Sequence, residues 1–149
     1  MKIDKEKIFR LFEDKNIENT IKMVDINPKY KKIGMFTKLI LNHYIFHSKL
    51  EKFLQKEQPE YDMVSTKEAS EYIIFNRAWG FIKDIDPEDK VDISCILEFN
   101  SNYLNKSLND SIFYFQEYEE YEKCSHLFKI QQVIKNNVPT QNSLCNLET

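Results

Sequence analysis

The sequence predicts an all-α protein: a single-domain bundle of five or six mostly antiparallel helices that ends in a C-terminal helical hairpin. The first reason is that apolar residues recur at steps of three and four between residues that commonly cap helices. The second is that only 2 of the 149 residues are glycine, which leaves few positions for the left-handed turns that glycine favours. The third is an aromatic content of 13%, so packed rings should dominate the core. We expect one helical domain over residues 1–137 and a flexible tail over residues 138–149.

Two short helices are expected before the first proline. Asp4 can cap a helix that runs to about Glu13, and Asn16 can begin a second one. Asn27 should end the second helix, because a residue that precedes proline is pushed out of the α region.

The strongest element is a helix over about residues 29–56, with Pro28 in its first turn, where the missing N–H is harmless. At ~1.5 Å per residue this helix is on the order of 40 Å long, enough to form one spine of the bundle. An irregular connection over residues 57–65 should follow, with Pro59 as its breaker. The stripe that predicts the helix consists of Ile33, Phe36, Ile40, His43, His47, Leu50 and Leu54.

Two further capping signals divide the middle of the chain. Ser65 and Glu68 form a capping box that should begin a fourth helix. Asp86 and Pro87 should begin a fifth helix whose apolar residues continue as far as Leu108. The acidic residues around this second signal fit helix initiation, since no glycine stands where a calcium-binding EF-hand loop requires one.

A turn is expected near Glu117 and Tyr118, followed by a last helix to about Asn137, because one helix from Pro87 onward would greatly exceed ordinary lengths. The stretch FYFQEYEEYEKCSHLFKI, residues 113–130, resembles the acidic helical hairpin of UVR-type and tetratricopeptide-like segments. In those families such hairpins serve contacts between proteins. The resemblance therefore implies a hairpin, and it implies nothing about a named partner.

Composition argues for a cytoplasmic protein. The first ten residues are charged and lack the apolar core of a signal peptide, and no stretch is apolar and long enough to span a bilayer. Cys95, Cys124 and Cys145 are too few and too far apart for a disulfide framework or a zinc site of paired cysteines, so we expect reduced thiols. Abundant Ile, Asn and Lys are typical of AT-rich coding, which would suit a phage or mobile-element protein.

No enzyme signature is present, and we predict neither catalytic residues nor a cofactor. Gly34 and Gly80 belong to no nucleophile elbow or phosphate-binding loop, and both fall inside expected helices, where small size would serve close packing. His43 and His47 are four residues apart and could hold one metal ion from the same helix face, with His126 or Cys124 as further ligands. The alternative is a pair of neutral histidines at a helix seam.

The charges are unevenly distributed along the chain. Residues 1–56 carry thirteen Lys and Arg against seven Asp and Glu, whereas residues 57–149 carry eight against seventeen. Such asymmetry could reflect a basic surface for an anionic partner, attraction between two faces within the fold or between copies, or solvated helix faces that happen to segregate. Arginine, which reads base edges, is present only twice. The candidate residues for nucleic acid are Lys22, Lys29, Tyr30, Lys31, Lys32 and Lys38.

An aromatic and acidic band near the C-terminus has more rings than one helix face can bury, and we expect some of them to form a contact surface. Its candidate residues are Tyr114, Tyr118, Glu119, Glu120, Tyr121 and Glu122. The sequence thus favours a small non-enzymatic interaction protein, such as an adaptor, accessory subunit or inhibitor, whose partner is another protein and which could self-associate. The alternatives are a nucleic-acid-binding accessory factor and a helical-bundle metalloprotein.

Overall fold

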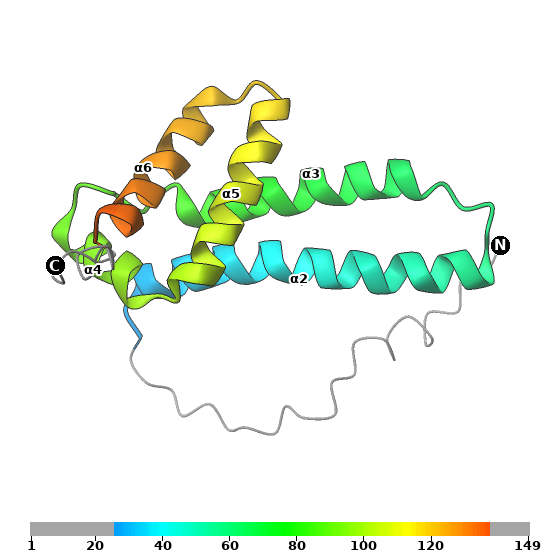
Figure 1. Ribbon diagram of the computed structural model, residues 1–149, viewed down its shortest axis with the longest axis horizontal. Helices are drawn as coiled ribbons and strands as arrows, with labels where there is room; N and C mark the ends of the chain where they lie inside the picture. Colours follow the sequence, from blue (N-terminus) through cyan, green and yellow to red (C-terminus); the bar gives the residue numbers. More distant parts are fainter. Residues whose placement is uncertain (1–25, 138–149) are drawn as a thin grey trace, which may run out of the picture.

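The computed structural model describes residues 26–137, and in that range the chain folds into helices joined by short loops, without β-strands (Figure 1). The predicted all-α bundle with a C-terminal hairpin is confirmed. The two helices expected before Pro28 fall, as far as residue 25, outside the described residues, and so does the expected tail over residues 138–149. The helices are α2 (Pro28–Glu57), α3 (Met63–Ile82), α4 (Lys90–Glu98), α5 (Ser101–Glu117) and α6 (Tyr121–Asn137).

The helix α2 is one continuous rod of 30 residues, as its apolar stripe predicts. Asn27 caps it by accepting the backbone N–H of Lys29 at 2.9 Å, and Pro28 occupies the first turn. α2 and α3 form an antiparallel hairpin, and α5 and α6 form a second hairpin that lies across one end of the first (Figure 1). The short α4 contacts both α2 and α6.

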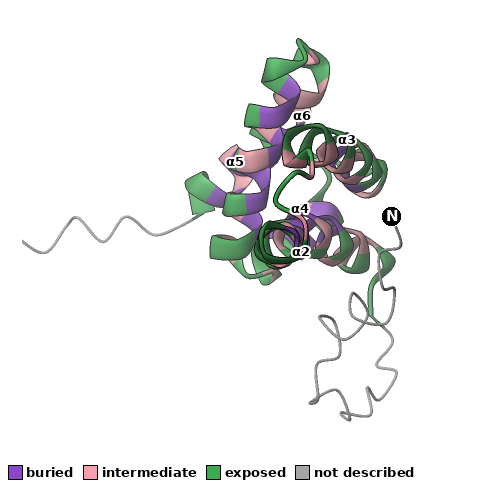
Figure 2. Cartoon of the chain, turned by 90° about the vertical axis from the view of Figure 1, so that its right-hand side faces the viewer, coloured by how far each residue is buried: buried purple, intermediate pink, exposed green. Residues whose placement is uncertain are grey.

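The core occupies the end of the molecule where the two hairpins cross. Figure 2 shows the buried residues on the sides of the helices that face one another. Away from the crossing, α2 and α3 pack mainly on each other, and Leu54 is the one buried residue between residues 44 and 74. Fully buried aliphatic and aromatic side chains from all five helices make up the core, among them Ile33, Phe36, Ile40, Phe75, Ile82, Ile96, Leu104, Leu108, Phe115, Leu127 and Ile130.

Two of the predicted helix starts are wrong. The carboxylate of Asp62, not Ser65, caps α3, and it accepts the backbone N–H groups of Val64 and Ser65 at 3.1 and 3.2 Å. α4 likewise begins at Lys90 and is capped by Asp89, not by Asp86. The hydroxyl of Ser65 itself donates to Oδ2 of Asp62 at 2.7 Å, so Ser65 supports the cap at Asp62 and does not form one of its own.

The expected fifth helix over residues 87–108 is two helices. Phe99 leaves the helical region at φ −77° and ψ 153°, and the side chain of Asn100 caps α5. The ring of Phe99 packs against Tyr30 at a centroid distance of 5.4 Å. Ile96 before the break and Leu104 after it are both buried. The helical spacing of apolar residues therefore continues across the break, and the sequence does not reveal the bend.

The predicted turn near Glu117 is confirmed. Its geometry is a Schellman motif, in which the N–H of Glu120 donates to the carbonyl of Phe115 at 2.9 Å and that of Glu119 donates to Gln116 at 3.1 Å. Glu119 has φ +57°, so a glutamate occupies the left-handed position that glycine usually fills. The last helix accordingly begins at Tyr121 and runs to Asn137.

None of the helices between residues 26 and 137 combines the length and hydropathy that crossing a bilayer requires.

Candidate functional site

The basic residues at the start of α2 are bound to the acidic loop that joins α3 to α4. Nζ of Lys29 lies 3.0 Å from Oδ2 of the buried Asp92 and donates to the backbone carbonyl of Asp84 at 2.6 Å. Nζ of Lys32 lies 2.7 Å from the carboxylate of Asp84, and this hydrogen bond and charge hold the pKa of that carboxyl below its usual value. Asp92 also accepts the backbone N–H of Asp86 at 2.8 Å. Part of the charge asymmetry is thus neutralised inside one chain.

The other candidate residues for nucleic acid have different surroundings. Tyr30 is half-buried and packs on Phe99, with an interplanar angle of 58°. Lys31 and Lys38 are exposed, and neither forms an ion pair within the described range. Lys22 lies outside the described residues. The structure therefore leaves two exposed lysines, seven residues apart, from the six that the sequence singles out.

His43 and His47 lie at the seam between α2 and α3. His43 is buried, and its ring contacts His47 at 5.8 Å and Phe75 at 6.5 Å between centroids. Burial first, and then the charges of His47 and Lys67, lower the pKa of His43. This is the environment expected of a neutral histidine at a helix seam.

His126 is not part of that seam. Its ring meets Trp79 edge-on at 5.5 Å, and its Nε2 lies 3.3 Å from the carbonyl oxygen of Ile82. The thiol of Cys124 donates to the carbonyl of Ile112 at 3.5 Å. Among residues 26–137, no group of three or more His, Cys, Asp or Glu side chains is arranged to hold a metal ion.

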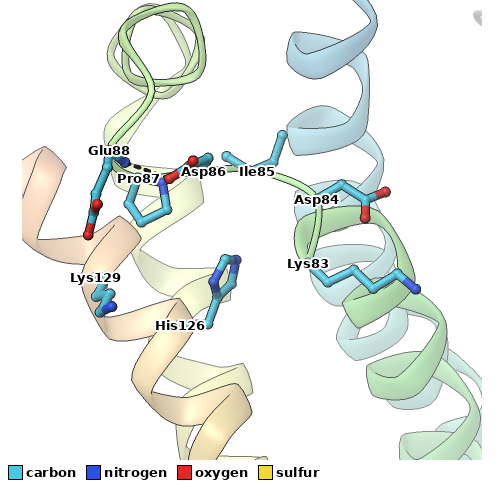
Figure 3. Close-up of a pocket in the computed structure, with 8 residues that line it drawn as sticks. All are labelled: Lys83, Asp84, Ile85, Asp86, Pro87, Glu88, His126 and Lys129. Atoms are coloured by element: carbon cyan, nitrogen blue, oxygen red, sulfur yellow. Dashed lines mark hydrogen bonds between the residues drawn. The ribbon is translucent and has the colours of Figure 1, made fainter.

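A shallow cavity of about 390 Å³ lies between the α3–α4 loop, residues 83–88, and the side chains of His126 and Lys129 on α6 (Figure 3). In Figure 3 the ring of His126 points toward the loop, while the side chain of Lys83 points away. Both signs of charge line the cavity, and it holds no cysteine or serine nucleophile. Its lining is therefore polar and mixed in charge.

The aromatic and acidic band divides into core and surface residues. Tyr114 is only 5% exposed and stacks on Phe75 with ring centroids 4.2 Å apart, so it belongs to the core. Glu120 pairs with Lys123, whose Nζ also donates to Oδ1 of Asn76 at 3.2 Å. Neither Tyr114 nor Glu120 is free to meet a partner.

Lys123 makes contacts that the sequence does not reveal. Its ammonium lies 4.6 Å from the ring centroid of Phe115 and 5.8 Å from that of Trp79, besides its bonds to Glu120 and Asn76. Cation–π contacts of this kind add to stability when they are partly desolvated. The side chain thereby ties the first turn of α6 to α3.

Four members of the band remain at the surface. Tyr118 and Tyr121 are 52% and 62% exposed, and Glu119 and Glu122 are exposed beside them. Tyr118 rests on Tyr114, with ring centroids 4.8 Å apart. The α5–α6 turn therefore presents two tyrosines and two carboxylates on a rigid base.

Tyr72 of α3 is a further exposed ring, which the sequence does not single out. It is 62% exposed, and its backbone carbonyl accepts Nδ2 of Asn76, the residue that holds Lys123. One helical turn therefore separates Tyr72 from the point where α6 is tied to α3. A lone tyrosine in an amphipathic stretch carries no signal of exposure, and only the packing of α6 reveals this one.

The chain matches no protein-family model, and no curated protein and no solved structure is significantly similar to it.

Proposed function

We propose that this protein binds another protein through the α5–α6 turn and the adjoining face of α3. The observation that carries the proposal is the exposure of Tyr118 and Tyr121 at this turn and of Tyr72 one helical turn from Asn76, each ring being more than half accessible. We call this region the turn surface, and it consists of Tyr72, Tyr118, Glu119, Tyr121 and Glu122.

Tyrosine is well suited to protein recognition. Its ring offers a large contact area, its hydroxyl tolerates water in the free protein, and few rotamers are lost on binding. Tyrosine is for this reason enriched among the residues that dominate binding energy. Three exposed tyrosines near one turn therefore favour a binding surface over a surface that only faces solvent.

The turn surface rests on ordered neighbours. Tyr118 packs on Tyr114, which stacks on Phe75 of α3 with an interplanar angle of 8°. The Schellman hydrogen bonds hold the backbone of Glu119, and Lys123 ties α6 to α3. A preorganised surface loses little conformational freedom on binding, which raises affinity for a given contact area. Such a protein would act as an adaptor, accessory subunit or inhibitor, and its AT-rich coding bias would suit a phage or mobile element.

The test compares partner capture by matched tyrosine variants. The full chain, carrying a photoreactive side chain at position 125 of α6, is exposed to lysate of the native cell, and the captured proteins are identified by mass spectrometry. Tyr118→Ser combined with Tyr121→Ser should reduce capture of a specific partner at least tenfold. Tyr103→Ser is the control, because Tyr103 is 58% exposed on α5 but lies far from the turn in sequence. Circular dichroism confirms that each variant is folded.

Equal capture by the double variant and the control would overturn the proposal. Loss of capture in the Tyr103 control alone would do so too, because it would place the binding surface at the other end of α5.

A further inference from the structure

One side of α2 carries exposed lysines that form no ion pair within residues 26–137. Successive members are 7, 11, 3 and 4 residues apart, and steps of these sizes return to the same face of an α-helix. Lys29 and Lys32 of the same helix are, by contrast, paired with Asp92 and Asp84. We call this side the lysine face, and it consists of Lys31, Lys38, Lys49, Lys52 and Lys56.

No carboxylate of α2 shares the lysine face. The two glutamates of the helix, Glu51 and Glu57, are sequence neighbours of Lys52 and Lys56, and adjacent residues of a helix do not face each other. Glu51 also accepts Nε2 of Gln55 at 3.4 Å. The positive charge of the lysine face is therefore not cancelled by its own helix.

The rest of the described chain is acidic. α2 carries seven Lys against two Glu, whereas residues 58–137 carry eight Lys or Arg against fifteen Asp or Glu. In Figure 1, α2 runs along one edge of the described fold, with α3 beside it. A long polyanion is therefore attracted to α2 and repelled by most of the remaining surface, which orients it on the lysine face.

The dimensions of the lysine face fit a rigid and regularly charged partner. At 1.5 Å per residue, Lys31 and Lys56 are ~37 Å apart along α2. One turn of B-form DNA is of the same length, about 34–36 Å. The duplex carries one phosphate charge per ~1.7 Å of its axis, and lysine binds phosphate as a point charge that needs no exact orientation.

We infer that α2 binds double-stranded DNA, with the helix along the major groove and the lysine face on the phosphates that flank it. Contacts of this kind carry no sequence information, and α2 contains no arginine to read base edges. The binding is therefore independent of sequence. It is also separate from the turn surface and goes beyond the proposed function.

Two other polyanions match the lysine face less well. The major groove of B-form DNA is about 12 Å wide and admits an α-helix, whereas that of duplex RNA is deep and narrow. A helix that lies in a membrane interface buries a broad apolar face. At the spacing of the lysine face, the exposed large apolar residues of α2 are only Met35 and Ile45.

The first experiment measures the affinity of the full chain for a labelled DNA duplex of about 24 base pairs by fluorescence anisotropy. The logarithm of the binding constant should fall with the logarithm of the salt concentration at a slope of about −4 to −5, because five lysines release counterions. Two duplexes of unrelated sequence should bind within threefold of each other. Absence of saturable binding in 50 mM salt, or a tenfold preference for one sequence, would overturn the inference.

Matched lysine variants locate the contact. Lys38→Gln combined with Lys52→Gln should weaken DNA binding at least fivefold and make the salt slope shallower by about 2. The control, Lys83→Gln combined with Lys129→Gln, removes the same charge from two exposed lysines outside α2 that form no ion pair within the described range. The control should stay within twofold of the wild type. Equal weakening by both pairs would show that only net charge matters and would contradict the inference.

Further probes separate DNA from other partners. An RNA duplex of the same sequence and vesicles with one-third phosphatidylserine should both bind more weakly than the DNA duplex. Equal or tighter binding of either would show that the assignment to DNA is wrong. Tyr118→Ser combined with Tyr121→Ser should bind DNA as the wild type does, so the protein-binding proposal and this one can fail separately. Loss of DNA binding in that variant would place the DNA at the turn surface and not on the lysine face.

Discussion

At the scale of single residues, Glu119 is the clearest departure from what the sequence leads one to expect. A chain with two glycines suggests few left-handed positions, yet the α5–α6 turn needs one and fills it with glutamate. An L side chain at such a φ costs roughly 1–2 kcal/mol, and glycine avoids this cost. The sequence predicts the turn but not its geometry, because glutamate carries no left-handed signal.

Glu119→Gly should therefore stabilise the protein by about 1 kcal/mol, measured as a higher midpoint of urea unfolding. Glu122→Gly is the matched control, because Glu122 lies in the first turn of α6. That substitution should destabilise the fold by about 0.5–1 kcal/mol. A loss of stability in Glu119→Gly would contradict the backbone argument.

Asp92 shows how little of the candidate site can be predicted from the sequence. Its carboxylate is buried, and it accepts both the ammonium of Lys29, 63 residues away in the chain, and the N–H of Asp86. The sequence presents these residues only as a basic stretch and an acidic stretch. Their pairing depends on the tertiary fold, which no local pattern encodes.

Asp92→Asn should lower the free energy of unfolding by about 1–3 kcal/mol, because it leaves the donors of Lys29 and Asp86 with a weaker acceptor. Asp84→Asn should have a much smaller effect, since Asp84 pairs with Lys32 at the exposed surface. Chemical unfolding of the two variants side by side checks the difference. Equal losses would show that burial of the carboxylate does not matter.

At the scale of helices, the sequence predicts a helix with a long apolar stripe well, but it does not predict where a helix begins or ends. α2 follows its stripe almost to the residue because thirty residues of regular spacing outweigh any local ambiguity. The sequence does not show the break at Asn100, because the helical spacing of apolar residues continues across it. The start of α3 is misplaced because Asp62 and Ser65 are both good caps, and spacing alone does not rank them.

The two glycines of α2 and α3 also differ in their surroundings. A methyl group at Gly34 would meet Cε2 of Phe99 at 3.6 Å, an ordinary van der Waals contact, so alanine would fit there. A methyl group at Gly80 would meet nothing within 4 Å. Close packing, which the sequence suggests for both glycines, therefore requires glycine at neither position.

Gly80→Ala should stabilise the protein by about 0.5–1 kcal/mol, because alanine loses less backbone freedom in a helix and meets no obstacle here. Thermal unfolding followed by circular dichroism at 222 nm measures the gain. A decrease in the melting temperature would mean that this surface is covered in the folded protein.

At the scale of the whole molecule, His43 links stability to pH. The folded state holds the pKa of His43 below its ordinary value of 6.5, so the unfolded chain binds more protons as the pH falls below that value. The contribution of neutral His43 to the free energy of unfolding is fully present above about pH 6.5 and is lost as the pH falls toward the lowered pKa. His47 from α2 and Lys67 from α3 act in the same direction.

Urea unfolding at pH 7.5 and pH 5.5 tests this linkage. The wild type should lose more stability between the two conditions than His43→Leu, in which this residue no longer titrates. Burial raises the pKa of Asp110, so this carboxyl favours the folded state as the pH falls, in the opposite direction to His43. Both proteins contain Asp110, and its effect therefore cancels in the comparison. Equal losses in the two proteins would exclude His43 as the cause.

Because packing is uneven along α2, its two ends should not unfold together. Near Pro28 the rod is clamped by α4 and α5, whereas between residues 44 and 57 it relies on α3 and a single buried leucine. Local opening needs less free energy where fewer apolar contacts are lost. Deuterium should therefore replace the amide protons of residues 46–57 well before those of residues 33–43, and uniform exchange along α2 would show that the rod is equally supported throughout.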